Sequence, residues 1–420
     1  MAHGSLRFAV LPPSYPPYLP RSNLCKSVVM KRREMMRSSA LGAAWLASLG
    51  IPETVWALQD GEELVTFTDY TEAFRVEASP ANTRVRCFDL RRLTTWATPN
   101  EEFYAFAQTT TQNVDAANYK LHVSGHVDKP RELTLAEIMA RPDRREVPVT
   151  LECSGNSTRP NRMSGLLSNG VWTGVGLASL LKECGVRPEA REVVFLGRDM
   201  TSEKRTISGN EVTVPHGRSM YVQDALNPDA MLAFSLNGQP LPVEQGFPLR
   251  LILPGWYGMT QIKWLGRIHV LDRRYEGQHM TRNYLAIRGV DTPDGSLWLD
   301  TSISKTNMKS VVARVTKRRV AGGDEFRITG PAWGGQTPIA HVDVQIDNGA
   351  WQRAVLEPSR GPYAWRLWSL TVKDMAPGPH TVHSRATDTS GRMQPTAEER
   401  RKTMAGGRED FSIWTRAITV

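Results

Sequence analysis

Short apolar runs separated by polar turns predict a mixed α+β domain between about residues 101 and 300. In residues 119–125, apolar and polar positions alternate with a period of two, which is typical of a half-buried strand. Further strands are predicted at residues 192–197 and 249–255, where apolar runs stop at glycine or at a Pro-Gly pair.

Helices are predicted between these strands from their start and stop signals. Thr134 and Glu137 have the spacing of a capping box, so a helix begins there. Residues 177–184 form a leucine-rich helical pattern, and Gly185 is expected to end it.

A different rhythm begins at about residue 310 and runs to residue 420. Apolar and charged residues alternate through residues 342–346, and Asn348-Gly349 predicts a hairpin turn. Several short strands over roughly 100 residues favour an immunoglobulin-like β-sandwich.

Composition and charge narrow the class of protein. The hydrophobic share of 40% and the charged share of 23% are ordinary for a globular chain. Residues 1–57 hold seven Lys/Arg and two Asp/Glu, so they account for five of the nine net positive charges. The remaining positive charge is too small to indicate nucleic-acid binding, although it leaves room for a basic pocket. The sequence contains no HExxH, GxGxxG or P-loop motif. It also contains no CxxCH motif, so we expect no haem in this chain.

The N-terminus resembles an export signal. Residues 31–37 form a twin-arginine region, residues 41–51 are moderately apolar, and residues 55–57 offer a cleavage site. Met30 is a possible true start, and a basic amphipathic helix is the alternative interpretation. We therefore expect residues 1–57 to be a leader and the protein to reach the periplasm by the twin-arginine route.

Cys153 is the candidate centre of chemistry. It follows a short apolar run and precedes Gly155-Asn156, so a tight turn presents its thiol from the end of a strand. A soft thiolate suits a redox-active transition metal. The alternative is a buried structural cysteine, as we expect for Cys87 and Cys184; Cys25 falls in the leader.

Basic residues beside glycine turns indicate a site for a phosphate-bearing cofactor. Arg250 follows the turn at Gly246, and Lys263 follows the loop that contains Gly258. Backbone amides together with Arg and Lys are the groups that hold phosphate. Asp199 and Tyr284 complete the set of polar candidates.

The order of motifs along the chain carries a specific resemblance. The motifs are Cys153-Ser154-Gly155-Asn156, Trp172-Thr173-Gly174-Val175, Leu236-Asn237-Gly238-Gln239-Pro240-Leu241-Pro242, Gly246-Phe247-Pro248-Leu249-Arg250 and Ile262-Lys263-Trp264-Leu265-Gly266. Over roughly residues 95–420, this order resembles the sulfite oxidase family of molybdopterin enzymes. The resemblance implies a catalytic domain at 58–305 that binds molybdopterin, and an immunoglobulin-like dimerisation domain at 310–420, hence a homodimer.

The resemblance also implies a molybdenum–molybdopterin cofactor, with one protein thiolate on the metal. Cys153 matches the thiolate position, and Tyr284 matches the active-site tyrosine. Cofactor contacts match Tyr104, Ala105, Asp199, Gln245, Arg250, Gln261 and Lys263.

The substrate side departs from the family. Phe106 stands where the family has one substrate arginine, and Thr158 stands at the second, with Arg159 one place later. Arg159 is expected to be catalytic together with Cys153 and Tyr284. Arg162 and Arg408 are further candidates for restoring the positive charge that the substrate pocket loses at Phe106 and Thr158. Each lost charge-assisted contact weakens anion binding by about 1.5–3 kcal/mol.

The predicted function is oxygen-atom transfer at sulfur. Sulfite oxidation is the leading hypothesis, with electrons passed to a separate cytochrome or quinone-linked subunit. Methionine sulfoxide reduction is the alternative, because the run Phe103-Tyr104-Ala105-Phe106 resembles the periplasmic methionine-sulfoxide reductase branch. A non-enzymatic binding protein is the second alternative. His216, His269 and His279 are expected to be structural; the alternative for His279, five residues before Tyr284, is a place near the pocket.

Overall fold

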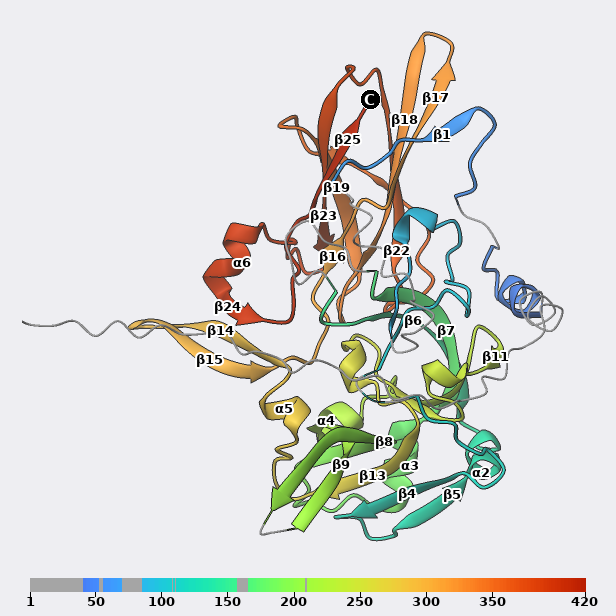
Figure 1. Ribbon diagram of the computed structural model, residues 1–420, viewed down its shortest axis with the longest axis vertical. Helices are drawn as coiled ribbons and strands as arrows, with labels where there is room; N and C mark the ends of the chain where they lie inside the picture. Colours follow the sequence, from blue (N-terminus) through green and yellow to red (C-terminus); the bar gives the residue numbers. More distant parts are fainter. Residues whose placement is uncertain are drawn as a thin grey trace, which may run out of the picture.

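The computed structural model describes residues 41–52, 56–69, 85–107, 109, 111–156, 165–207 and 210–420. Figure 1 shows a C-terminal β-sandwich at one end of the molecule and the sheet that contains β4, β8 and β13 at the other. The fold is α+β: few, short helices accompany many strands, as the sequence predicted.

Two sheets build the catalytic domain. One has the order β5 (Arg131–Thr134), β4 (Lys120–Gly125), β13 (Leu265–Leu271), β8 (Glu192–Ile207) and β9 (Asn210–Tyr221). The other has the order β11 (Gln239–Pro240), β10 (Met231–Leu236), β7 (Leu167–Gly176) and β6 (Arg144–Glu152), and β12 (Arg250–Ile252) also pairs with β10. Only β4 and β13 pair in parallel among these strands.

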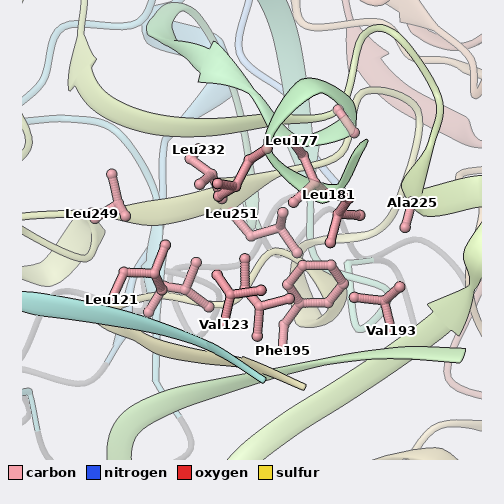
Figure 2. Close-up of a cluster of buried hydrophobic side chains, with 14 of the residues drawn as sticks. Leu121, Val123, Leu177, Leu181, Val193, Phe195, Ala225, Leu232, Leu249 and Leu251 are labelled. Carbon is pink, nitrogen blue, oxygen red and sulfur yellow. The ribbon is translucent and has the colours of Figure 1, made fainter. Parts of the chain in front are cut away.

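A single apolar core joins these two sheets around helix α3 (Leu177–Cys184). Figure 2 shows Leu177 and Leu181 of this helix between side chains of β4, β8, β10 and β12. Cys184 is fully buried in this core, which confirms its packing role. Burial of apolar area is the main force that holds the sheets together.

The local start and stop signals are confirmed. Helix α2 (Leu135–Met139) begins at a capping box in which Thr134 and Glu137 bond each other's backbone N–H. Helix α3 ends at Gly185, whose φ of 67° lies in the left-handed region that glycine enters at little cost.

The C-terminal domain is a two-layer sandwich. One sheet contains β1 (Glu62–Leu64), β16 (Lys309–Ser310), β17 (Arg314–Val320), β18 (Gly323–Trp333), β21 (Val355–Leu356) and β22 (Arg366–Lys373). The other contains β19 (Ile339–Ile346), β20 (Gln352–Arg353), β23 (Pro379–Asp388) and β25 (Thr415–Thr419). The predicted turn after β19 is present, with Asp347 in the left-handed region. The inner faces of both sheets meet at Trp368, Val342 and Phe326.

The lead-in segment differs from the sequence-based division. We placed residues after 58 in the catalytic domain, yet β1 pairs with β17 of the sandwich, and Phe67 bridges Ile418. Contacts with the sandwich explain this placement. The Glu62 carboxylate accepts hydrogen bonds from Arg327 and Thr316, and Phe67 packs in the sandwich core.

The described part of the predicted leader packs onto the fold. Residues 41–48 are helical, and Ile51 and Trp56 are buried in a core cluster near the start of the sandwich. The backbone of Trp56 bonds Thr94 and Arg314. No described helix is long and apolar enough to cross a membrane. The twin-arginine residues 31–37 lie outside the described residues.

The remaining elements are small. Strands β14 (Leu285–Thr292) and β15 (Gly295–Ser302) form a hairpin that projects sideways in Figure 1, and β24 (Met404–Gly407) pairs with β14. The other elements are β2 (Val85–Arg86), β3 (Ala105–Phe106), α4 (Val222–Ala225), α5 (Gln278–Thr281) and α6 (Ala397–Thr403).

Candidate active site

A cleft at the end of β6 contains the described residues that the sequence singled out. The space inside it is about 660 Å³, counted to its open mouth. Its lining includes Tyr104, Ala105, Cys153, Asp199, Gln245, Arg250, Gln261, Lys263 and Tyr284. Arg159, which we also expected here, lies outside the described residues, as do Thr158 and Arg162.

Cys153 is fixed by a tight turn directly after β6. Its backbone N–H donates to the carbonyl of Leu166 at 2.9 Å, and Asn156 N–H donates to the carbonyl of Cys153 at 2.8 Å. The side chain is buried, and burial raises the pKa of the thiol to about 11, although a Gly155 N–H opposes this. The free thiol is therefore protonated at neutral pH, and a metal that binds it must displace the proton.

Glu152 anchors the thiol-bearing turn to the sandwich. Its carboxylate accepts from Lys309 Nζ at 2.5 Å, from Trp333 Nε1 at 2.9 Å and from Asn156 Nδ2 at 2.9 Å. Glu152 and Lys309 are both fully buried. This network places Cys153 relative to both domains, because β16 and β18 carry two of its members.

Gly258 lets a loop lie directly against the thiol-bearing strand. A Cβ at this position would lie 2.5 Å from the Tyr104 hydroxyl oxygen and 3.3 Å from the Glu152 carbonyl oxygen. Only glycine allows that approach, so this loop forms a close-fitting wall of the cleft.

Arg250 is a buried guanidinium without a carboxylate partner among the described residues. Its Nη1 donates to the backbone and side-chain oxygens of Gln245, and its Nη2 donates to the Gln261 carbonyl. Burial lowers the pKa of Arg250 to about 10, and its Nε has no hydrogen-bond partner in the described part of the chain. A buried, uncompensated cation of this kind favours an anionic ligand.

The amide of Gln245 donates to the Tyr104 carbonyl at 2.7 Å, which joins the β3 region to the Arg250 turn. Gln261 uses its whole amide on backbone: it accepts from Leu253 N–H and donates to the carbonyls of Leu253 and Trp256. Gln261 therefore shapes the wall of the cleft through its own loop.

Lys263 and Asp199 add charge at the other side of the cleft. Lys263 Nζ donates to the carbonyls of Phe106 and Glu244, both at 3.0 Å. Burial, helped by Arg250, lowers the pKa of Lys263 to about 7. Burial raises the pKa of Asp199; one of its oxygens accepts from Thr109 at 2.6 Å, and Oδ1 has no partner among the described residues.

Two arginines lie over Tyr284. The guanidinium carbon of Arg218 is 5.9 Å from the ring centroid, and that of Arg408 is 5.7 Å away. Arg218 is buried and donates to the carbonyls of His279 and Ile303, whereas Arg408 is exposed. Arg408 was one of the cations that the sequence offered as a substitute; Arg218 was missed.

His216 was also missed as a cleft residue, because the sequence suggested a structural role. It lies on β9 across from residues 197–199, where β8 bulges between Leu196 and Met200. The local sequence pattern carries no signal for this, since the pairing of β9 with the preceding strand β8 is what brings His216 into the same cleft as Asp199.

These residues fit a molybdopterin cofactor. Arg250 Nε and Lys263 would provide positive charge for its phosphate, Asp199 Oδ1 would accept from an N–H group, and Cys153 would provide one soft ligand for the metal. All four residues line the same cleft.

Two family models match the chain. Residues 108–279 match the oxidoreductase molybdopterin binding domain, and residues 300–408 match the Mo-co oxidoreductase dimerisation domain. The first match contains Cys153 and every predicted cofactor residue except Tyr104 and Ala105.

Curated relatives include sulfite oxidase of Gallus gallus, which is 30% identical over 322 residues, covering 71% of this chain and 68% of that protein. Mitochondrial sulfite oxidase of Mus musculus is 31% identical over 325 residues, covering 71% of this chain. Inducible nitrate reductase [NADH] 2 of Glycine max is 28% identical and matches 66% of this chain. The chain spans 57% of the mouse protein and 34% of the soybean protein.

Among solved structures, the sulfane dehydrogenase SoxCD from Paracoccus pantotrophus has a similar fold. The TM-score is 0.67 at 24% sequence identity, and the match covers 84% of this chain and 96% of that one.

Proposed function

The chain belongs to the sulfite oxidase family of molybdopterin-dependent oxidoreductases, and on this premise we propose that it oxidises sulfite. The observation that supports this choice is the position of Arg218 and Arg408 over Tyr284, which lines the cleft with Cys153. Their guanidinium carbons lie 5.9 and 5.7 Å from the centroid of the tyrosine ring. They supply the positive charge that Phe106 does not, and a small oxyanion needs that charge.

Each cleft residue has a role in this proposal. The molybdenum cofactor, when bound, supplies the two-electron oxygen-atom chemistry at sulfur. Cys153 holds the metal, Arg250 and Lys263 hold the cofactor phosphate, and Asp199 accepts a hydrogen bond from the pterin ring.

On the substrate side, Arg408 attracts the anion at the mouth of the cleft, and the Tyr284 hydroxyl orients it. Arg218 keeps the tyrosine in place through the carbonyls of His279 and Ile303. Arg159 remains a proposed further contact with the anion.

We propose that electrons leave to a separate one-electron carrier, either a cytochrome or a quinone-linked subunit. The match to a dimerisation domain supports a homodimer through the C-terminal domain. Export to the periplasm through the twin-arginine region stays a proposal from the sequence.

Sulfoxide reduction is the second candidate, and one observation favours it. Phe106 lines the cleft and is 36% exposed, so part of the substrate side is apolar. The apolar part of a neutral sulfoxide substrate would pack there without needing the arginines.

The decisive experiment compares substrates on one molybdenum-loaded preparation. We expect sulfite oxidation, and Arg408→Ala should raise the KM for sulfite about tenfold to a hundredfold, since one charge-assisted contact contributes about 1.5–3 kcal/mol. The matched control is Arg401→Ala, an exposed arginine on α6.

Three other outcomes contradict the proposal. Turnover of methionine sulfoxide without turnover of sulfite would select the reductase. An Arg408→Ala variant with an unchanged KM would remove the anion-binding role. A protein that takes up no molybdenum under full cofactor supply would favour the non-enzymatic binding protein.

A further inference from the structure

Two imidazole rings stand between the active cleft and a second cavity. His216 lines the cleft, and His279 lines a neighbouring cavity of about 560 Å³, counted to its open mouth. The two ring centroids are 4.4 Å apart. The other residues around the second cavity are Val214, Pro215, Gly217, Tyr275, Glu276, Gly277 and Gln278.

The row of rings continues to the active-site tyrosine. The His279 ring centroid is 6.0 Å from that of Tyr284, which lines the cleft. His279 is 5% exposed, and its Nδ1 lies 3.4 Å from Asn283 Nδ2. His279 is thus next to two cleft residues, Tyr284 and His216, and also borders the second cavity.

The proposed reaction needs a path for protons. Sulfite oxidation follows SO₃²⁻ + H₂O → SO₄²⁻ + 2 H⁺ + 2 e⁻, in which water provides the oxygen and a one-electron carrier takes the electrons in turn. Both protons are released in the cleft where sulfite reacts. Sulfoxide reduction would consume two protons there, so either direction requires a route.

Resting on this proposed function, we propose that His216 and His279 relay protons between the active cleft and the second cavity. Imidazole is suited to this role because it accepts a proton on one nitrogen and donates from the other. The ring centroids are 4.4 Å apart, so the two imidazoles are in contact and a proton has only a short distance to cross between them.

The charges around His216 and His279 allow a proton to move between the two rings without being bound tightly by either one. Burial, followed by Lys263 and Arg218, lowers the pKa of His216 to about 4, so its ring is a neutral acceptor at pH 7. Its Nδ1 is buried and has no hydrogen-bond partner in the described part of the chain. On the other side, His279 lies within electrostatic reach of Asp199.

The cavity side provides the exit. Tyr275 and Glu276 line the second cavity together with His279. Arg218 donates to the backbone carbonyls of His279 and Ile303, which fixes the backbone that carries the His279 ring beside this cavity.

The first test is chemical rescue in the molybdenum-loaded protein. His279→Ala should lower kcat about a hundredfold, within the usual range for assisted proton transfer, with little change in KM. Added imidazoles should enter the second cavity and restore turnover, with rates that depend on the pKa of the added base. The matched control is His269→Ala, a partly buried histidine on β13 bonded to Ser124. Its turnover should not respond to imidazole.

A second readout does not depend on turnover. Exchange of the imidazole C2 hydrogen, followed by mass spectrometry over a pH series, reports the pKa and the water access of each histidine. We expect His279 to exchange, and its pKa to shift in a His216→Gln variant, because paired sites titrate together.

Each result decides the proposal. Loss of kcat without rescue by any imidazole, in a variant with normal molybdenum content and melting temperature, would overturn the relay. So would a His279 ring protected from exchange, or a pKa of His279 that ignores His216→Gln. A wild-type protein that turns over neither substrate would reject the proposed function instead, and the exchange data would then decide the relay alone.

Discussion

At the scale of single residues, the site is built from charges that the fold leaves uncompensated. Arg250 and Lys263 are cations held by carbonyl oxygens, and burial raises the pKa of the Cys153 thiol even though Lys309 and Arg408 oppose the shift. Such groups cost free energy unless a ligand completes them. The cofactor is therefore expected to stabilise the folded chain as well as to supply its chemistry.

Lys263 gives this idea a pH dependence. Its pKa falls from 10.5 when unfolded to about 7 when folded without ligand, so above pH 7 the unfolded chain binds more protons. The stability of the cofactor-free protein should therefore rise from pH 7 to about 8, below the usual cysteine pKa of about 8.5. Bound phosphate should restore the charge on Lys263 and flatten the slope.

Thermal unfolding of the cofactor-free and loaded proteins over this pH range checks the prediction. Lys263→Met should remove the slope from the cofactor-free protein, whereas Lys402→Met, at an exposed position, should keep it. Equal slopes in the wild type and in Lys263→Met would show that another group is responsible.

Glu152 is the second residue whose replacement has a defined outcome. Glu152→Gln leaves Lys309 fully buried without its countercharge, which should cost about 3–5 kcal/mol of unfolding free energy. Denaturant unfolding measures this loss. Glu152→Gln with Lys309→Met should recover much of it, because the lone charge is gone.

The matched control for that change is an exposed pair. Glu398→Gln, which disrupts the contact with Lys402, should alter stability by less than about 0.5 kcal/mol. If Glu152→Gln were as mild as Glu398→Gln, the buried pair would not be what fixes the thiol-bearing turn.

At the scale of elements, the sequence predicted what depends on neighbours in the chain. The capping box of α2, the left-handed glycine after α3 and the turn after β19 each rest on a few adjacent residues. Strand β1 was not predicted, because its three residues carry little pattern of their own. Its place is set by Glu62, whose side-chain partners Thr316 and Arg327 lie more than 250 residues away in the sequence.

Strand β1 makes a prediction of its own. Burial opposes ionisation of Glu62, but the Gln59 backbone, Thr316 and Arg327 outweigh it and lower the pKa of this carboxyl. Glu62→Gln should cost about 1–3 kcal/mol at neutral pH. Because the carboxyl pKa is lowered in the folded chain, ionised Glu62 stabilises the fold fully above the unfolded pKa of 4.5. This stabilisation is lost as the pH falls through the folded pKa.

The difference in unfolding free energy between Glu62→Gln and the wild type should therefore shrink toward zero on acidification. Glu63→Gln, on the same strand but exposed, is the control and should be neutral throughout. A constant difference at all pH values would show that shape, not charge, holds β1.

At the scale of the whole molecule, the metal-holding side of the site was predictable and the substrate side was not. Cys153, Arg250 and Lys263 sit in short motifs with fixed spacing, and the structure brings them to one cleft. The pairing of β9 with β8 brings His216 to the cleft and Arg218 to the ring of Tyr284, and no local pattern marks either residue. Glu152 meets Lys309 across 157 positions, which links the two domains at the thiol.

The central claim is that Cys153 holds the molybdenum, and X-ray absorption at the molybdenum edge tests it most directly. The account predicts three sulfur neighbours in the wild-type protein, two from the pterin dithiolene and one from Cys153. Cys153→Ser should retain two, and Cys87→Ser, which removes the half-buried thiol near the site, should retain three. An equal sulfur count in the wild type and in Cys153→Ser would contradict it.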